Sequence, residues 1–148
     1  MGTWGAKVFE DDTAMEFYDE FCYSEQSIEE LEDGLDTVLS QTYDMDDLLM
    51  EGFEEPIKAL VYAEIIATIN GKPSDKLPDD EYHEDMELPK INFEKLKLDL
   101  KSDLKMKAIE TITKIQEDDK MHLTVLWMES ESLAAWQQNL NDLKQRLA

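Results

Sequence analysis

The sequence is poor in cysteine, and it has no long uncharged apolar run. Its 148 residues contain one cysteine, Cys22, so an internal disulfide framework is excluded. No charged and apolar leader opens the chain, and together with the lone cysteine this predicts a reducing, cytoplasmic setting. The longest apolar run, residues 57–69, contains Lys58 and Glu64. It is too short and too charged to predict a membrane span.

Basic residues are scarce as well. Fourteen Lys and Arg stand against 36 Asp and Glu, which gives a net charge of -22. Such a surface would repel nucleic acid and an anionic membrane, so we expect neither as a partner. A basic protein partner, a cation or no partner remain. Residues 1–57 hold eighteen acidic residues and one basic residue, Lys7, so the acidic face is predicted there. The seven lysines between Lys90 and Lys114 could neutralise part of it.

The apolar run at 57–69 predicts a buried helix, at about residues 56–70. Pro56 suits the first turn of a helix, and Asn70-Gly71 followed by Pro73 is a typical end. Because the run is apolar on most of its circumference, we expect other elements to surround it. The sequence therefore predicts an all-α, single compact domain over residues 1–148, with five or six helices around this central helix.

Helical spacing of apolar residues predicts the remaining helices. Thr13 with Glu16, and Ser27 with Glu30, resemble capping boxes and open helices at about 13–23 and 27–43. One long helix is predicted at about 92–117. A short helix follows Asp118-Asp119, and Ser130 can cap the last one. The seam of that last helix is predicted to dock on the core rather than to form a dimer, and its members are Leu133, Trp136, Leu140, Leu143 and Leu147.

Two segments lack a helical pattern. Residues 1–12 form an N-terminal arm, for which Trp4 and Phe9 are the predicted anchors. Asp11 or Asp12 should cap or precede the first helix. Residues 72–90 form an acidic loop with three prolines, which we expect to lack regular structure through most of its length and to be mobile rather than functional.

The stretch from Gly2 to Ala14, which includes Trp4-Gly5 and Phe9-Glu10-Asp11-Asp12, resembles the N-terminal signature of a family of small bacterial proteins known as a domain of unknown function, number 4259. The run from Ala63 to Pro73 and the C-terminal leucines and tryptophans are similar to that family too. Lys7 stands where the family tends to have glycine. The resemblance implies a fold and no chemistry. Its motif residues, predicted to be structural, are Gly2, Trp4, Gly5, Phe9, Asp11, Asp12, Ala14, Glu64 and Trp127.

Glu64 is a carboxylate in the middle of an apolar helix, so it must be paired, hydrogen-bonded or neutralised. We expect it to accept hydrogen bonds from the arm, for instance from the Trp4 indole or the backbone around Gly5. The alternative is a catalytic or ligand-binding acid with a raised pKa. No histidine, cysteine or second carboxylate in the same helix is spaced to work with it, which favours the structural role.

No other motif predicts catalysis, a cofactor or a metal. His83 lies beside Glu84 and Asp85, but no second histidine or cysteine stands at ligand spacing, so a solvated charge run is the better interpretation. Cys22 lies on an apolar stripe and is predicted to be a small core residue. No phosphate-binding glycine loop or nucleophile elbow occurs. These absences favour a protein that is not an enzyme.

The function that fits these features best is an acidic protein-binding module that covers a basic partner, as an immunity protein or an antitoxin does. Its predicted contact residues are Glu29, Glu32, Asp33 and Asp36, on the polar face of the second helix. A hydrolytic enzyme or a divalent-cation binder that uses Glu64 or the acidic loop is the alternative. A monomer is favoured over a dimer.

Overall fold

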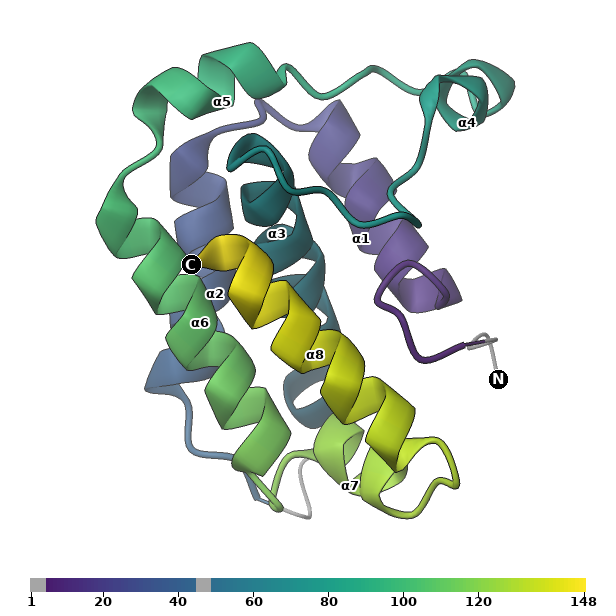
Figure 1. Ribbon diagram of the computed structural model, residues 1–148, viewed down its shortest axis with the longest axis vertical. Helices are drawn as coiled ribbons and strands as arrows, with labels where there is room; N and C mark the ends of the chain where they lie inside the picture. The colour runs from purple at the N-terminus through teal and green to yellow at the C-terminus, as the bar shows by residue number, and fades with distance from the viewer. Residues whose placement is uncertain (1–4, 45–48) are drawn as a thin grey trace.

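The computed structural model describes residues 5–44 and 49–148. Over these residues the chain forms eight α-helices and a short π-helix, and no strand (Figure 1). The predicted all-α class is confirmed, whereas the predicted number of helices, five or six, is wrong. The elements are α1 (Asp12–Tyr23), α2 (Ile28–Ser40), η1 (Leu49–Glu54), α3 (Glu55–Ile69), α4 (Asp80–Asp85), α5 (Phe93–Asp99), α6 (Ser102–Glu117), α7 (His122–Met128) and α8 (Leu133–Leu147).

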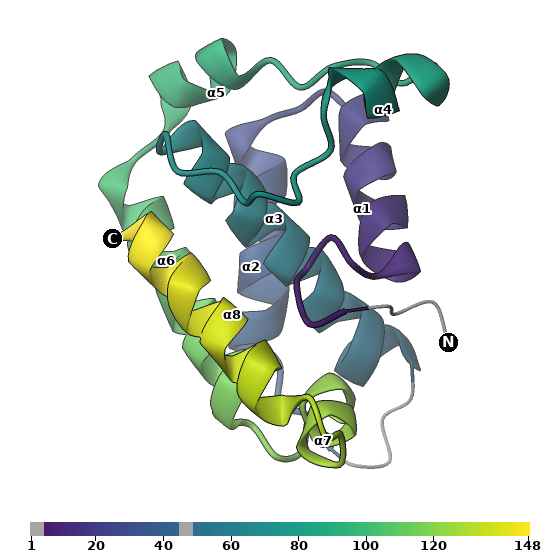
Figure 2. The same cartoon turned by 45° about the vertical axis from the view of Figure 1, so that its right-hand side comes forward.

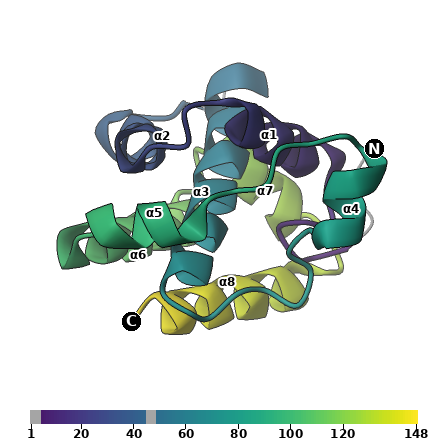
Figure 3. The same cartoon turned by 90° about the horizontal axis from the view of Figure 1, so that it is seen from above.

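Helix α3 contains the long apolar run, and twelve of its fifteen residues are buried. It packs against α1, α2, α5, α6 and α8. Seen from above, α3 lies between α2 and α8 (Figure 3). Pro56 stands in its first turn, and Gly71 follows its end with a φ of 84°, a left-handed conformation that glycine adopts without strain. None of the described helices combines the length and the apolar character needed to cross a bilayer.

The last three helices cover one side of α3. Helices α6 and α8 run side by side, and α7 joins them at one end of the molecule (Figure 2). Four members of the predicted α8 seam are buried within the single chain, as expected: Trp136, Leu140, Leu143 and Leu147. The helix begins after Ser132 rather than after Ser130, whose hydroxyl instead accepts a hydrogen bond from the Ser132 N–H.

Two N-caps fix where α1 and α2 begin. The Asp11 carboxylate accepts a hydrogen bond from the Ala14 N–H at 2.9 Å, so Asp11 caps α1 as predicted, and the capping box at Thr13 is wrong. The Ser27 hydroxyl accepts from the Glu30 N–H at 3.1 Å, which confirms that cap. Helix α2 ends at Ser40, three residues before the predicted end. There the Lys114 ammonium of α6 donates to its terminal carbonyl oxygens.

Gly34 lets α2 approach α3 closely. A Cβ atom built on Gly34 would collide with Cδ2 and Cε2 of Tyr62, whose ring is buried on α3. On propensity alone, a glycine in the interior of a helix weakens the helix. In the structure, the Tyr62 ring occupies the space that a side chain on Gly34 would need.

The predicted helix 92–117 is two helices. Leu100 and Lys101 are extended, with ψ angles of 129° and 148°, and they separate α5 from α6. Nothing in the local sequence breaks a helix there. The break lets α5 turn away from α6 and pack on α3, so that Leu96 and Leu104 are both buried in the core (Figure 1). Tertiary packing overrides helix propensity at this point.

The segment 72–90 is more regular than predicted. It contains α4, whose N-cap Asp79 accepts a hydrogen bond from the Tyr82 N–H at 2.9 Å. The segment is also fastened to α1, because the Tyr82 hydroxyl donates to the Asp19 carboxylate at 2.8 Å. The acidic connector before α3 likewise includes η1, which the sequence did not predict.

Candidate functional site

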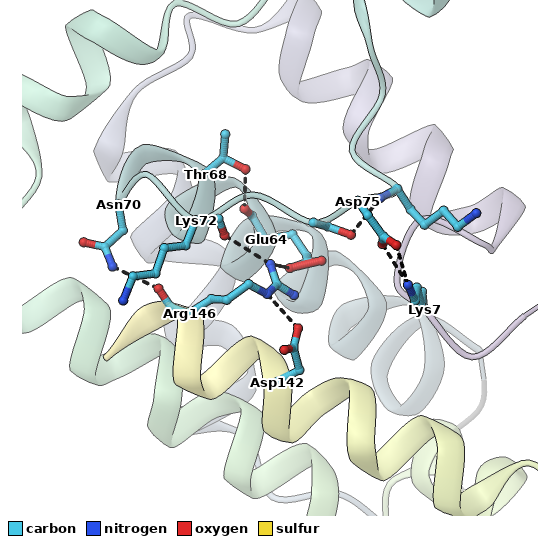
Figure 4. A network of polar contacts seen from close by, with 10 residues as sticks. Lys7, Glu64, Thr68, Asn70, Lys72, Asp75, Asp142 and Arg146 are labelled. Atoms are coloured by element: carbon cyan, nitrogen blue, oxygen red, sulfur yellow. Dashed lines mark hydrogen bonds and ion pairs between the residues drawn. The ribbon is translucent and has the colours of Figure 1, made fainter.

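The buried carboxylate of Glu64 is the centre of the candidate site. Helix α3 places it in the core with 1% of its surface exposed, and Nη1 of Arg146, on α8, lies 2.7 Å from its Oε1 (Figure 4). Glu64 was predicted to accept hydrogen bonds from the arm, but within the described residues its polar partner is this arginine. Trp4, one of the two predicted arm partners, lies outside the described residues, so that part stays a prediction; the prediction that the carboxylate must be paired is confirmed.

Arg146 joins Glu64 to the surface. Its Nε donates to the Asp142 carboxylate at 2.8 Å, one turn earlier on α8, and its Nη1 lies 3.4 Å from the Lys72 carbonyl oxygen. The Arg146 carbonyl in turn accepts a hydrogen bond from the Asn70 side chain at 2.9 Å. Figure 4 shows these contacts between the end of α3 and the last turns of α8. The network fastens α8 to α3.

Burial and charge act on this carboxyl in opposite directions. Burial raises the pKa of Glu64 above its ordinary value of 4.5, and the guanidinium of Arg146 opposes the rise. Burial lowers the pKa of Arg146, but Glu64 and Asp142 hold that pKa above its ordinary value. We take the raised pKa of Glu64 as the governing effect, because almost none of its side chain reaches solvent.

The arm residues of the predicted motif occupy structural positions. Gly2 and Trp4 lie outside the described residues. A Cβ atom on Gly5 would lie 2.5 Å from the carboxylate of Glu10. Phe9 is buried with its ring edge-on to Tyr18, at 5.7 Å between centroids. Ala14 is buried in α1, and Asp12 is exposed in its first turn.

Trp127 lies at the other end of the motif. Its ring stacks on Trp136 of α8, with 5.5 Å between the centroids and 6° between the planes. Trp127 is only partly buried, and with Trp136, Leu123 and Ala6 it helps to line a small recess beside the arm. The stacking joins α7 to α8 and gives Trp127 a packing role.

The four predicted contact residues of α2 divide into two pairs. Lys107 of α6 lies 3.1 Å from the Glu32 carboxylate and 2.9 Å from that of Asp36, so these two acids share one compensating positive charge within the molecule. This confirms that lysines of the α6 region compensate part of the acidic face. Glu29 and Asp33 are exposed and form no ion pair with any described residue.

His83 is buried, which overturns its assignment to a solvated charge run. Its Nδ1 lies 3.1 Å from the Pro89 carbonyl oxygen, and its Nε2 lies 2.8 Å from the Tyr18 hydroxyl. Because a carbonyl only accepts, Nδ1 carries the proton, and Tyr18 donates to Nε2. The imidazole therefore holds the segment 72–90 against α1.

Neither the cysteine nor the metal-binding residue types form a candidate site among the described residues. Cys22 is buried, and burial raises the pKa of its thiol to about 12, as for an unreactive core residue. Across the described part of the chain, no three His, Cys, Asp or Glu side chains are grouped as metal ligands would be. The arrangement around Glu64 supports structure and charge pairing rather than acid-base chemistry, since its carboxylate has no accessible surface for a substrate.

Sequence reasoning missed Arg146. Its only signal is composition: Arg146 is the sole arginine among fourteen basic residues. Arginine is the residue best suited to a buried ion pair, because its guanidinium is planar, permanently charged and rich in donors. A lone arginine in a lysine-rich chain could therefore have been matched with the lone acid of the apolar helix.

Comparison with known proteins identifies the family. Residues 2–139 match the family model described as Domain of unknown function (DUF4259). The chain belongs to this family. No curated protein and no solved structure matches the chain. The DUF4259 assignment agrees with the resemblance seen in the sequence, and it attaches no activity to the network around Glu64.

Proposed function

We propose that this member of the DUF4259 family is an acidic protein-binding module that acts as a monomer in the cytoplasm and covers a basic partner. The observation that carries the proposal is the pair Glu29 and Asp33, exposed on α2 without an ion pair to any described residue. Helix α1 also has exposed acids, which add to the negative charge of the N-terminal half: Asp12, Glu16 and Glu20.

The acidic face also contains a groove that a partner side chain could enter. It lies between α2 and α3, has a volume of about 330 Å³ and includes Glu30 and Asp33 in its lining. The ammonium of Lys58 lies in the same groove, 5.7 Å from the centroid of the Tyr62 ring. The groove thus already holds one cationic side chain between acids and an aromatic ring, and the exposed acids outside it remain available to a basic partner.

The alternatives have less support. A hydrolytic role for Glu64 would need a carboxylate that a substrate can reach, whereas this one is buried against Arg146. A divalent-cation site would need clustered ligands, which the described residues do not provide.

The proposal is tested with the protein that co-purifies from the native host, once it is identified and purified. We expect its association rate to fall about tenfold or more between low and high salt, because surface fields are screened within about 8 Å at physiological ionic strength. The double variant Glu29→Lys/Asp33→Lys should slow association at low salt and keep the fold.

The matched control is Glu129→Lys/Glu131→Lys, which changes the net charge equally at two exposed positions beside α7 and α8. It should slow association much less. A partner with an acidic or neutral contact surface, a rate that salt does not change, or equal effects of the two double variants would each refute the proposal.

A further inference from the structure

A second groove lies between the start of α1 and the segment that follows α3. One wall is formed by Phe9, Asp12 and Met15, and the other by residues 75–79 and by Tyr82 of α4. Its volume is about 500 Å³, within the range of about 300–1,000 Å³ that is usual for ligand sites. Among the described residues, it shares no lining residue with the groove between α2 and α3. Figures 1 and 2 show α4 beside α1.

The apolar part of the lining is held in place. Phe9 is buried, and Met15, Leu77 and Tyr82 pack against the core while they stay partly exposed. The Tyr82 hydroxyl donates to the Asp19 carboxylate at 2.8 Å, which ties the two walls together. A groove with fixed walls loses little freedom on binding. Its apolar lining favours an apolar side chain as the part of a ligand that enters.

Acids outnumber cations in the lining. Its charged residues are Asp12, Asp75, Asp79 and Lys76. Lys7 lies 2.8 Å from the Asp75 carboxylate, so this acid is already compensated. Asp12 and Asp79 are exposed and form no ion pair with any described residue. Lys76 opposes them, so the groove itself has a small excess of negative charge.

The excess is much larger on the two helices beside the groove. Helices α1 and α4 carry further acids that are at least partly exposed: Glu16, Asp19, Glu20, Asp80, Glu81, Glu84 and Asp85. Among the described residues their one ion-pair partner is Lys90, 3.4 Å from the Asp80 carboxylate. Helix α1, with twelve residues, is about 18 Å long. A small ligand would meet only part of this field, whereas a basic protein would meet all of it.

We propose that this groove receives an apolar side chain from a basic segment of a partner protein, and that lysine or arginine residues on either side of it contact the acids of α1 and α4. The inference rests on the proposed function for the class of partner, a basic polypeptide. It adds a contact that Glu29 and Asp33 do not supply. It also states what the segment must contain, which is a large apolar residue with cations around it.

The test uses a library of random dodecapeptides displayed on phage, selected on the wild-type protein and counter-selected on Met15→Gln. Glutamine keeps the length and the helix propensity of methionine but makes the groove polar. The acids of α2 are unchanged in this variant, so counter-selection removes peptides that bind there. We expect the enriched peptides to carry a net positive charge and a large apolar residue. Thermal unfolding checks that Met15→Gln is folded.

Two neutralised charges in the groove should act in opposite directions on the affinity of the synthesised winner. Asp12→Asn should weaken binding about two- to fivefold, and Lys76→Gln should strengthen it by a similar factor, as for single exposed charge pairs. Both positions are exposed, so neither variant threatens the fold. The matched control is Glu20→Gln, about 12 Å further along α1. It should change the affinity less, because exposed charges are screened within about 8 Å at physiological ionic strength.

A library that yields no peptide, winners without a net positive charge or a large apolar residue, or a shift in the same direction for Asp12→Asn and Lys76→Gln would overturn the inference. The variant Glu29→Lys/Asp33→Lys separates it from the proposed function. If the winner behaves as expected and this variant does not slow the native partner, the groove stands and the contact at α2 falls. A native partner that is slowed, with a library that yields no such peptide, would give the opposite result.

Discussion

At the scale of single residues, Glu64 shows how far a sequence can specify a contact. An acid inside an apolar helix had to be paired, and that much followed from the sequence. Its partner did not, because Arg146 is distant in the chain and periodicity carries no information on which helices meet. The same limit applies to His83, whose acidic neighbours Glu84 and Asp85 are exposed while its own ring is buried against Tyr18.

The raised pKa of Glu64 predicts a particular dependence of stability on pH. Its folded-state pKa exceeds the unfolded value, so its contribution to stability is complete below pH 4.5 and is lost as the pH rises through the folded-state pKa. Glu64→Gln cannot titrate. The unfolding free energy of the wild type minus that of Glu64→Gln should therefore fall as the pH rises through this window. The slope is at most about 1.4 kcal/mol for each pH unit between the unfolded-state and folded-state pKa values.

Urea unfolding of both proteins between about pH 4 and pH 8 measures this difference. Arg146→Lys in both backgrounds is the control, since it keeps the positive charge but lacks the planar guanidinium. A difference that grows as the pH rises would show that attraction to Arg146 outweighs burial, and the assigned direction of the Glu64 pKa would then be wrong.

At the scale of elements, local signals located most helices and missed their interruptions. Apolar spacing identified α1, α2 and α8, the Ser27 cap located the start of α2, and the run before Gly71 identified α3. The break at Leu100-Lys101 was not predicted because no proline or glycine stands near it and the apolar spacing continues through it, and the packing of α5 on α3 accounts for it. Helix α4 was missed because three prolines and a run of charges masked six helical residues.

The contact of α2 with α3 predicts that Gly34→Ala is destabilising. Helix propensity alone would stabilise the variant by up to about 1 kcal/mol. The added methyl group would meet the buried Tyr62 ring, and overpacking of this kind costs about 1–3 kcal/mol. We expect a net loss of up to about 2 kcal/mol in the free energy of unfolding, measured by chemical denaturation. Ser40→Ala, at an exposed position of the same helix, should change it little. A Gly34→Ala protein more stable than the wild type would disprove the close-approach explanation.

At the scale of the whole molecule, charge and packing both favour a single copy. Two lysines of α6 form polar contacts with α2. Lys107 pairs with Glu32 and Asp36, and Lys114 donates to carbonyl oxygens at the C-terminal end of α2. Among the described residues, exposed acids such as Glu29 and Asp33 are left for solvent or for a partner. The net charge of -22 makes two copies repel each other.

The buried seam of α8 predicts that the protein is a monomer. Trp136, Leu140 and Leu143 are in contact with the protein's own core, so this stripe is not left open for a second copy. Light scattering after gel filtration should give a mass near 17.2 kDa. The value should hold at high salt, where charge repulsion is screened. A dimer that appears when salt is added would contradict the packing argument and leave repulsion as the sole reason for a monomer.

The ion pair between α3 and α8 also orders events during synthesis. The ribosome completes α3 well before α8 is made, and domains begin to fold as they emerge. Until α8 is made, there are two possibilities. Glu64 is buried as the neutral acid, or it stays ionised and keeps one side of α3 exposed to water. A nascent chain that stops before Arg146 therefore cannot close its core around a paired carboxylate. Such a fragment would have either a neutral Glu64 in its core or the α8-facing side of α3 open to the cell's proteases.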